Sequence, residues 1–349
     1  MEQSRIEKIL ALHFHPEQGS PFWLERQQHL GLNVMAEIRS RHDFHRLGIM
    51  DVEALRTRPI TDFIPRALHQ DLSSHLLSET GGTTGDPCRR VFSAQEFHDA
   101  FIAPWLKAVA EHNFPQGGRW LFVGPGGPHI IDRSARAMAM AMGSLEPFTV
   151  DCDVRWIKHQ APGSMGLKLY LAHVLAQAAN IIGHQKIDTL FTTPPLLVEL
   201  ARIMNPAQRD QIHGIHTGGM NLAPQTAMEL REQFRQAVIL PGYGNSLFGV
   251  TFPRVKRNEE DVFQVRDPAL WLQLAPLPKN EHTVQDLTIC VAPGQRGRVI
   301  LHRLDASFLI LNLPERDTAM AVAVADGELG LSRIAPLEFA TPRNRQGVY

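Results

Sequence analysis

The spacing of apolar residues changes along the chain and predicts different local structure in successive regions. Residues 1–75 show helical spacing, as at Ile6, Ile9 and Leu10. Between residues 50 and 72, prolines interrupt two short helical stretches. The chain is therefore expected to begin with a helical region.

From residue 78 onward, short apolar runs alternate with longer amphipathic stretches. The runs predicted as strands are Trp120–Val123, Thr189–Thr192, Ile212–His216 and Ala237–Leu240. Between the last two, Pro224 suits a first helical turn, and the apolar residues that follow share one helical face. Strands that alternate with crossover helices predict a mostly parallel sheet.

After about residue 250 the segments RVILHRL, FLILNL and MAVAVA are rich in strand-forming residues and are separated by glycine or charged turns. They predict a smaller β subdomain. The expected fold class is therefore α/β, with mostly parallel sheets, packed helices, a helical N-terminal lead-in and a C-terminal β subdomain. The expected domains are 1–75, 76–250 and 251–349.

Charge and composition disfavour several classes of function. With 35 basic and 36 acidic residues, the net charge of -1 favours neither nucleic acid nor an anionic membrane as a partner. The charged start MEQSRIEKIL is unlike a signal peptide, and no later run is expected to reach the roughly 18 apolar residues of a membrane span. We expect a cytoplasmic protein.

Cysteine and histidine give little support for a metal site. The three cysteines, which lie far apart without a CxxC pair and are expected to be reduced, are Cys88, Cys152 and Cys290. His13/His15 and His213/His216 are spaced so that either pair could bind a metal or be ordinary core or surface histidines. No nearby carboxylate or thiol completes either set, so no metal ligands are assigned.

The segment SETGGTTGDP, at 78–87, is the most informative. Three glycines and three threonines between Thr80 and Gly85 allow the backbone to approach a ligand closely and to present amides and hydroxyls, which suits a polyphosphate. A glycine-rich hairpin is the alternative interpretation. It is not a Walker loop, because the chain contains no Gly-Lys dipeptide.

Two other glycine clusters disfavour common enzyme classes. VGPGGPHIID at 123–132 lacks the third glycine of the dinucleotide fingerprint, which disfavours a nicotinamide enzyme. GYGNSLFG at 242–249 lacks the spacing of a hydrolase nucleophile elbow, which disfavours a serine hydrolase.

Four segments in order resemble the adenylate-forming enzymes. They are the Thr/Gly loop 78–87, IHTGGMNLAP at 215–224, LPGYGNSL at 240–247 and RDTA at 316–319. The branch that they resemble is that of phenylacetate-CoA ligase and the acyl-protein synthetase of bacterial bioluminescence. ALRTRPITDFIPRAL, at 54–68, is similar to the helical lead-in of that branch, and the resemblance spans roughly residues 50–335.

The resemblance implies a role for individual residues. Those matching the loop around the β and γ phosphates of ATP are Gly82, Thr83, Thr84 and Gly85. Those matching the turns around adenine and the acyl group are Gly218, Gly219, Met220, Gly242, Tyr243 and Gly244, with Tyr243 stacked on the base. The remaining matches are Ser246 facing the α-phosphate, Asp317 at the ribose hydroxyls and His129 beside the substrate carboxylate. Tyr243 as a packed turn aromatic and Asp317 as a turn former at a strand end stay open as alternatives.

The implied activity is ATP-dependent activation of a carboxylic acid, with Mg²⁺ as cofactor. A carboxylate oxygen attacks the α-phosphorus and pyrophosphate leaves, so the protein must bring two anions together. Fixed hydroxyl and N–H dipoles can stabilise the developing charge. Thr83, Thr84, Ser246 and His129 are accordingly the candidate catalytic residues.

Three departures from the family pattern bear on that activity. Asp86 adds a negative charge to the phosphate loop where the family has a neutral or basic residue. Leu247 stands where the family has a Glu that helps to hold Mg²⁺. Only 32 residues (349 minus 317) follow Asp317 and the last lysine is Lys279, so the family's mobile lysine-bearing C-terminal domain is expected to be absent.

These features leave three hypotheses. The first is an acid–AMP ligase that acts on an aryl or other apolar acid and passes the acyl group to CoA, an amine or a carrier protein, with a separate partner supplying the lid. The second is a degenerate homologue that binds a nucleotide or acyl ligand without turnover. The third is an acyltransferase that receives an acyl group activated elsewhere, for which Cys88 is a candidate acceptor. Small and apolar residues near 126–130 and 192–194 favour an apolar acid pocket.

Overall fold

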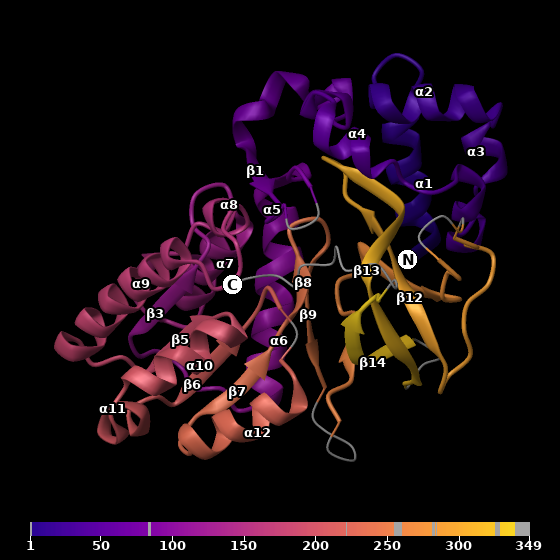
Figure 1. The fold of residues 1–349 in the computed structure, drawn as a ribbon. Helices are drawn as coiled ribbons and strands as arrows, with labels where there is room; N and C mark the ends of the chain where they lie inside the picture. Colours follow the sequence, from indigo (N-terminus) through magenta and orange to yellow (C-terminus); the bar gives the residue numbers. More distant parts are fainter. Residues whose placement is uncertain are drawn as a thin grey trace. The chain divides into compact units, whose positions relative to one another are not determined.

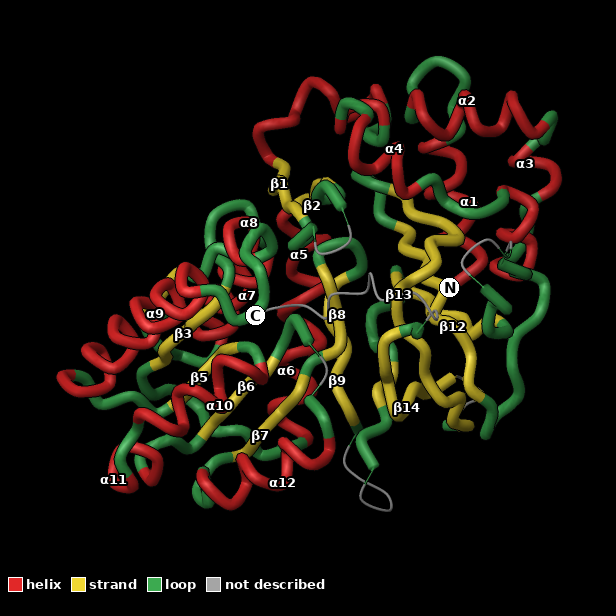
Figure 2. The backbone as a smooth tube through the Cα atoms, in the orientation of Figure 1, coloured by secondary structure: helices red, strands yellow, loops and turns green. Residues whose placement is uncertain are grey.

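The computed structural model describes residues 2–82, 85–220, 222–254, 260–280, 283, 285–324 and 329–338. The chain divides into two compact units; Figure 1 labels many of their helices and strands, and Figure 2 colours them by type. The first unit comprises Met1–Ser78, Asp86–Ala100 and Glu260–Asn344. The second comprises Glu79–Gly85, Phe101–Glu259 and Arg345–Tyr349.

The first unit begins with short helices, as the apolar spacing predicts. They are α1 Glu2–His13, α2 Pro21–Leu30, α3 Val34–Glu37, η1 Arg41–Leu47, α4 Val52–Thr57, η2 Ile60–Asp62 and η3 Arg66–Ser74. The short helices η2 and η3 begin directly after Pro59 and Pro65. Proline disfavours helical backbone at the residue before it, so each proline separates one short helix from the next. The α2 residue Phe22 packs against Phe63, with ring centroids 4.6 Å apart, so these helices share an aromatic core.

The rest of the first unit is mainly antiparallel β structure. Its elements are β1 His75–Glu79, β2 Arg89–Ser93, α5 Ala94–Phe97, β10 Phe263–Gln264, β11 Leu270–Ala275, β12 Arg296–Leu304, β13 Leu309–Ala323 and β14 Leu329–Pro336. Strands β1 and β2 form a small sheet, and five others lie in the order β11-β12-β13-β14-β10. The antiparallel pairing of these five confirms the predicted C-terminal β subdomain.

The expectation of separate strands at FLILNL and MAVAVA is wrong, because Leu309–Ala323, which includes most of both segments, is the single long strand β13. The charged residues between them do not form a turn. Strand β12 remains paired with β13 on both sides of Pro314, and register shifts absorb the irregularity. Asn312, at φ 57°, marks a local kink, and its side chain donates to the carbonyls of Phe44 and Gly48.

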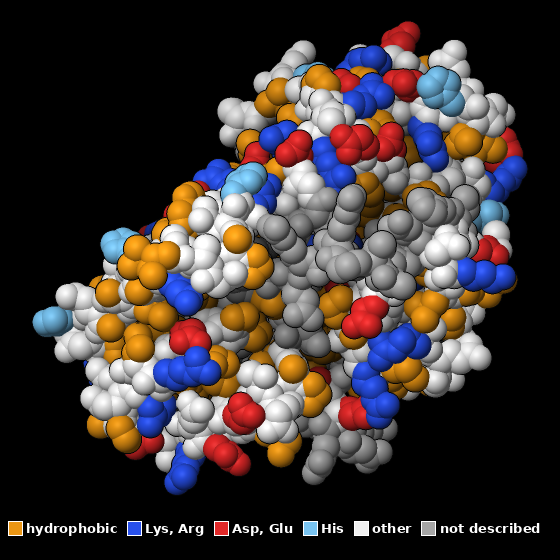
Figure 3. Space-filling view, viewed as in Figure 1, with side chains coloured by type: hydrophobic (Ala, Val, Ile, Leu, Met, Phe, Trp, Pro, Cys, Tyr) orange, Lys and Arg blue, Asp and Glu red, His pale blue; other side chains and the backbone are white. Residues whose placement is uncertain are grey.

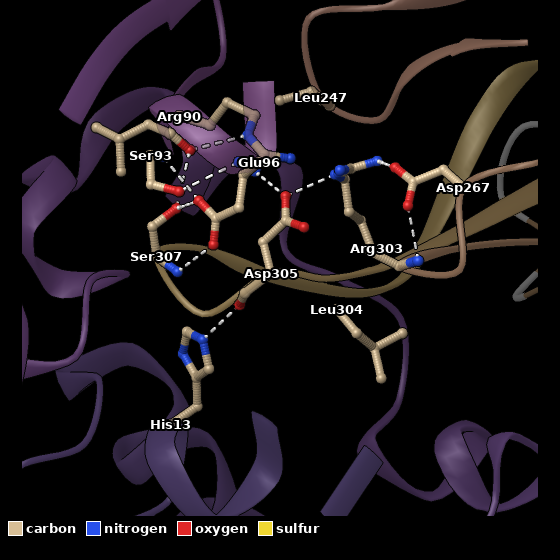
Figure 4. A network of polar contacts seen from close by, with 12 residues as sticks. His13, Arg90, Ser93, Glu96, Leu247, Asp267, Arg303, Leu304, Asp305 and Ser307 are labelled. Carbon is tan, nitrogen blue, oxygen red and sulfur yellow. Dashed lines mark hydrogen bonds and ion pairs between the residues drawn. The ribbon is translucent and has the colours of Figure 1, made fainter. Parts of the chain in front are cut away.

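A buried network of charges joins β2 to the end of β12 (Figure 4). Asp305 accepts hydrogen bonds from Arg90 Nη2 at 2.7 Å and from Arg303 Nε at 2.6 Å. Arg303 Nη1 also donates to Asp267 at 2.7 Å. Burial lowers the pKa of Arg90 to about 10, so it stays charged at neutral pH. Burial opposes the charge of Arg303, but the two carboxylates outweigh it and raise its pKa.

The same network extends to α5 and α1. Glu96 accepts from the backbone N–H groups of Ser93 and Ser307, at 2.7 and 2.9 Å. His13 lies within hydrogen-bond distance of Ser20 Oγ at 2.6 Å and of the Asp305 carbonyl at 2.9 Å. Burial lowers the pKa of His13 to about 4, so it is neutral at pH 7. It is therefore an ordinary core histidine.

The second unit contains a parallel sheet covered by helices. Its elements are α6 Ala103–Glu111, β3 Trp120–Gly124, α7 Ile130–Ala141, β4 Phe148–Asp151, α8 Val154–Ile157, α9 Met165–His184, β5 Thr189–Thr192, α10 Pro194–Ile203, α11 Pro206–Asp210, β6 Gly214–Thr217, α12 Pro224–Gln233, β7 Val238–Pro241, β8 Tyr243–Asn245 and β9 Gly249–Pro253. The short segment η4, His98–Ile102, precedes α6. The strand order is β4-β3-β5-β6-β7 and every pair is parallel. The four predicted strands, the helix beginning at Pro224 and the parallel sheet are confirmed.

The two faces of this sheet carry different side chains, because successive residues of a strand point to opposite faces. Leu121 and Val123 of β3 belong to the buried cluster formed with α9, α10 and α12. On the opposite face the Phe122 ring lies 5.3 Å from Phe191. The crossovers after β3 and β5 run to opposite sides, so the strand order reverses between these adjacent strands. Such a switch point is where open α/β sheets bind ligands, at the carboxyl ends of the strands.

Helix α9 is long and apolar enough to cross a membrane by length and composition, and 22% of its most apolar window is buried. The expectation that no segment would reach this threshold is therefore wrong. The helix covers the sheet through Leu167, Val174 and Ala178, which places it as the crossover between β4 and β5. Apolar side chains gather over it (Figure 3), among them Met165 and Leu169, at 69% and 64% exposure.

Candidate active site

The predicted residues of the second unit gather at the carboxyl edge of the parallel sheet. Gly218 and Gly219 directly follow β6, and Gly242 directly follows β7. His129 lies in the turn after β3. Because the strands are parallel, these turns lie at the same edge, and Gly242 N–H donates to the Thr217 carbonyl at 2.8 Å. Met220, which follows Gly219, belongs to the same turn.

The Thr/Gly loop begins at this edge. Glu79, the last residue of β1, bridges His129 in parallel fashion, and its N–H donates to the Pro128 carbonyl at 3.0 Å. The Glu79 carbonyl accepts from Ser246 Oγ at 2.9 Å and lies 3.3 Å from His129 Nδ1. One backbone position therefore joins the start of the loop to two residues that the sequence marks as catalytic.

The next part of the loop has the backbone that a glycine favours. Gly82 has φ 62°, in the left-handed region where a Cβ would be strained. Gly85 N–H lies 3.5 Å from the Gly82 carbonyl. Thr83 and Thr84 lie outside the described residues, and their predicted catalytic role stays a prediction.

His129 is buried with one ring nitrogen unused. It is 6% exposed, and its Nε2 has no hydrogen-bond partner among the described residues. Burial lowers the pKa of His129, and the nearby charge of Arg155 lowers it further. A carbonyl can only accept, so the contact with Glu79 assigns the proton to Nδ1 and leaves Nε2 as an acceptor. In this state Nε2 suits a hydroxyl, amine or thiol hydrogen better than a carboxylate.

Two threonine hydroxyls at the same edge also lack partners among the described residues; the sequence placed Thr193 near the expected acid pocket and gave Thr217 no role. Thr193 follows β5 and Thr217 ends β6; both are 1% exposed, and their Oγ1 atoms have no hydrogen-bond partner in the described part of the chain. Thr192, by contrast, donates to the Val123 carbonyl at 2.7 Å. Buried polar groups are normally paired, so unpaired ones at a switch point indicate a site for a polar ligand.

The aromatic turn is a tight hairpin of β8 and β9. A Cβ on Gly244 would lie 2.1 Å from the Gly249 carbonyl, and one on Gly242 would lie 2.9 Å from His216 Cε1, so both positions need glycine. Tyr243 between them is half-buried, and its ring lies 5.6 Å from that of Phe248 at 51°. The ring is not enclosed, and stacking on a base stays a prediction.

Ser246 and Leu247 follow in the same turn. The Ser246 hydroxyl already donates to Glu79, so it must release this bond to donate to a phosphate. Leu247 is 5% exposed, and its N–H donates to Asn245 Oδ1 at 2.8 Å. An apolar, buried side chain offers nothing to a cation at the position where the resemblance expects Glu.

The described residues do not fit a metal ion held by protein ligands. They contain no group of three or more His, Cys, Asp or Glu side chains that could hold one. His216 is buried, its Nδ1 contacts the Leu240 carbonyl at 2.8 Å, and burial lowers its pKa to about 4, so it is a neutral core histidine. We therefore derive no step through a protein-held Mg²⁺.

Asp317 lies inside strand β13 of the first unit, in register with Pro336. It is half-buried. The alternative that it forms a turn at a strand end is therefore wrong, and its role at the ribose stays a prediction.

The cysteines are free thiols, as expected. Cys88 is 6% exposed, which leaves little of the thiol available as an acyl acceptor. Cys152 is fully buried, and burial raises its pKa to about 12. Cys290 is exposed.

Comparison with solved structures identifies the fold. The chain is similar to 2-hydroxyisobutyryl-CoA ligase in complex with 2-HIB-AMP and CoA, with a TM-score of 0.70, 15% identity, and coverage of 97% of this chain and 68% of that one. An open conformation of that ligase gives a TM-score of 0.69 at 14% identity, covering 95% of this chain and 72% of that one. The fold is that of the adenylate-forming enzymes. No family model matches the chain, and no curated protein matches it.

The adenylate-forming fold confirms the expected α/β architecture. The chain spans 65–72% of the length of the ligase structures to which it is similar. At 14–15% identity the likeness extends to the fold, and the phenylacetate-CoA ligase branch stays a prediction.

Proposed function

We propose that the protein uses ATP to activate a carboxylic acid as its acyl-adenylate. The observation that carries the proposal is the Glu79 carbonyl, which ties the Thr/Gly loop to Ser246 and His129 at the carboxyl edge of the sheet. An adenylate-forming fold, and hydroxyls at the switch point without a partner among the described residues, support the same assignment.

The proposed reaction is a displacement at phosphorus. A carboxylate oxygen forms a bond to the α-phosphorus, the bond from that phosphorus to the bridging oxygen of the β-phosphate breaks, and pyrophosphate leaves with the electron pair. Fixed donors stabilise the charge that develops on the phosphoryl oxygens. Ser246 and the threonines at the sheet edge supply hydroxyls for this purpose.

We propose an aryl or other apolar acid as the substrate. A Cβ on Gly218 would lie 3.4 Å from the Phe191 ring and 3.7 Å from Ile131, so the backbone after β6 faces apolar side chains. An acid with an apolar body suits such a surface.

We propose CoA as the acyl acceptor, because the ligase of similar fold binds CoA and 2-HIB-AMP. An amine, a carrier protein and a separate lid-supplying protein stay predictions, as does a cytoplasmic location.

The test is a pyrophosphate-release assay with ATP and a panel of aryl and fatty acids. We expect release with at least one acid, and a fall of about 100-fold in its rate for Ser246→Ala, because removing one donor to a developing oxyanion costs about 3 kcal/mol. Ser144→Ala is the matched control, since the Ser144 hydroxyl also donates to a carbonyl of the second unit, at Gly118. Equal rates for the two variants would remove Ser246 from the mechanism.

The buried Leu247 favours a second candidate, a homologue that binds the nucleotide without turnover. Calorimetry with ATP, followed by analysis of the recovered nucleotide, separates the two. Tight binding of ATP that stays intact with every acid supports the second candidate.

A further inference from the structure

Lys158 brings a positive charge to the Thr/Gly loop from a distant part of the sequence. It follows α8 directly, and its Nζ donates to the Gly82 carbonyl at 3.4 Å. The lysine is half-buried, so its ammonium group lies at the loop and keeps access to solvent.

The segment that carries Lys158 is fixed from both sides. The Asp153 carboxylate accepts from the N–H groups of Arg155 and Trp156, at 2.8 and 3.4 Å, and so caps α8. The Asp153 N–H donates to the hydroxyl of Tyr170 on α9 at 2.6 Å. Lys158 N–H donates to the Val154 carbonyl at 3.1 Å. The backbone at Lys158 is therefore positioned by α8.

The charged groups near the Thr/Gly loop show why the positive charge of Lys158 matters there. The Arg155 guanidinium makes two hydrogen bonds to Asp153, at 3.0 and 3.3 Å, so a carboxylate offsets its charge. Asp151 accepts from Gly126 N–H at 2.7 Å and adds a further negative charge at this edge. A polyphosphate at the loop needs a cation to balance its charge, and the ammonium of Lys158 contacts the loop itself.

We propose that Lys158 binds the terminal phosphates of a nucleoside triphosphate and serves as a positioning cation. The proposal rests on the proposed function and names a cation for a polyphosphate at this loop. It also predicts that the lysine distinguishes ATP from AMP, because only ATP carries the phosphates that the loop is expected to hold. A compact ammonium group with three donors suits this contact.

The experiment is calorimetric titration of the full chain with ATP and with AMP, for the wild type and Lys158→Gln. We expect Lys158→Gln to weaken ATP binding about 10- to 100-fold, the effect of losing one hydrogen bond to a charged group, and to leave AMP affinity unchanged. Lys158→Arg keeps the charge and is expected to recover most of the ATP affinity. Lys168→Gln, at an exposed position on α9, is the matched control and should bind ATP as the wild type does.

The outcomes separate this inference from the proposed function. If the wild type binds neither ATP nor AMP, the proposed function fails. If the wild type binds ATP and Lys158→Gln binds it equally well, or loses ATP and AMP affinity to the same extent, Lys158 has no role at the phosphates. A melting temperature for each variant shows whether the substituted chain is folded.

Discussion

Two sets of buried polar groups, one in each unit, differ in their hydrogen bonding. In the first unit, Asp305 lies between Arg90 and Arg303, and all three are buried and hydrogen-bonded. In the second unit, the hydroxyls of Thr193 and Thr217 are equally buried, yet no described residue pairs with them. Paired charges in a hydrogen-bonded network stabilise a fold, whereas a buried hydroxyl without a partner lowers its stability. We therefore expect the first set to stabilise the fold and the second to contact the ligand of the proposed function.

The largest effect is expected from Asp305→Ala. The substitution leaves the buried guanidinium groups of Arg90 and Arg303 with less compensation. Breaking a buried ion pair from one side costs about 3–5 kcal/mol. Urea denaturation followed by circular dichroism measures the loss in the free energy of unfolding.

An exposed ion pair provides the control for Asp305→Ala. Glu146 pairs with Arg136 at 2.9 Å, and the two side chains are 57% and 37% exposed. Glu146→Gln is expected to cost less than about 1 kcal/mol. If Asp305→Ala costs no more than this, the network does not stabilise the first unit.

A smaller effect is expected on lowering the pH, and it involves one histidine in each unit. Burial lowers the pKa of His13 and of His216 to about 4, against about 6.5 in the unfolded chain. Above pH 6.5 both are neutral in either state. Between pH 6.5 and 4 the unfolded chain binds protons that the folded one does not, so each histidine lowers the free energy of unfolding by about 1.4 kcal/mol per pH unit.

The measurement is urea denaturation at several values between pH 7 and pH 5. His216→Gln and His13→Gln should each make the pH dependence shallower by about one proton. A variant with the slope of the wild type shows that its histidine is charged in the folded protein.

The smallest effects come from the neighbouring threonines after β5. Thr192→Val removes the hydrogen bond to the Val123 carbonyl and is expected to cost about 1 kcal/mol. Thr193→Val removes a hydroxyl without a described partner, so the free energy of unfolding is expected to stay the same or rise by up to about 1 kcal/mol. Its affinity for ATP or for the activated acid is expected to fall, which calorimetry measures.

Equal destabilisation by the two valine variants would contradict the comparison, because it would give the Thr193 hydroxyl a structural role. A Thr193→Val chain with unchanged ligand affinity would remove Thr193 from the binding site.

Much of the second unit could be predicted from the sequence, because local patterns determine it. Apolar runs such as Thr189–Thr192 mark buried parallel strands, and the glycine turns that follow must lie at their carboxyl ends. The single strand β13 was not predictable in this way. The charged residues in the middle of β13 predict a turn. The strand stays extended there because β12 pairs with β13 on both sides of Pro314.

Contacts between residues far apart in the sequence could not be predicted from it either. Arg90 and Asp305 are 215 positions apart, and nothing in either local sequence indicates that they meet. Lys158 reaches Gly82 across 76 positions, from a segment without a glycine or threonine motif. Only the folded structure within each unit shows which charged groups become partners.

The distribution of thiols has a practical consequence. Cys88 and Cys152 are buried and Cys290 is exposed, so the native sequence offers a single accessible position for a maleimide dye. Partial burial raises the pKa of Cys290, which favours coupling at mildly alkaline pH. The fluorescence of a dye on Cys290 can then be measured as nucleotide is added, without any substitution in the chain.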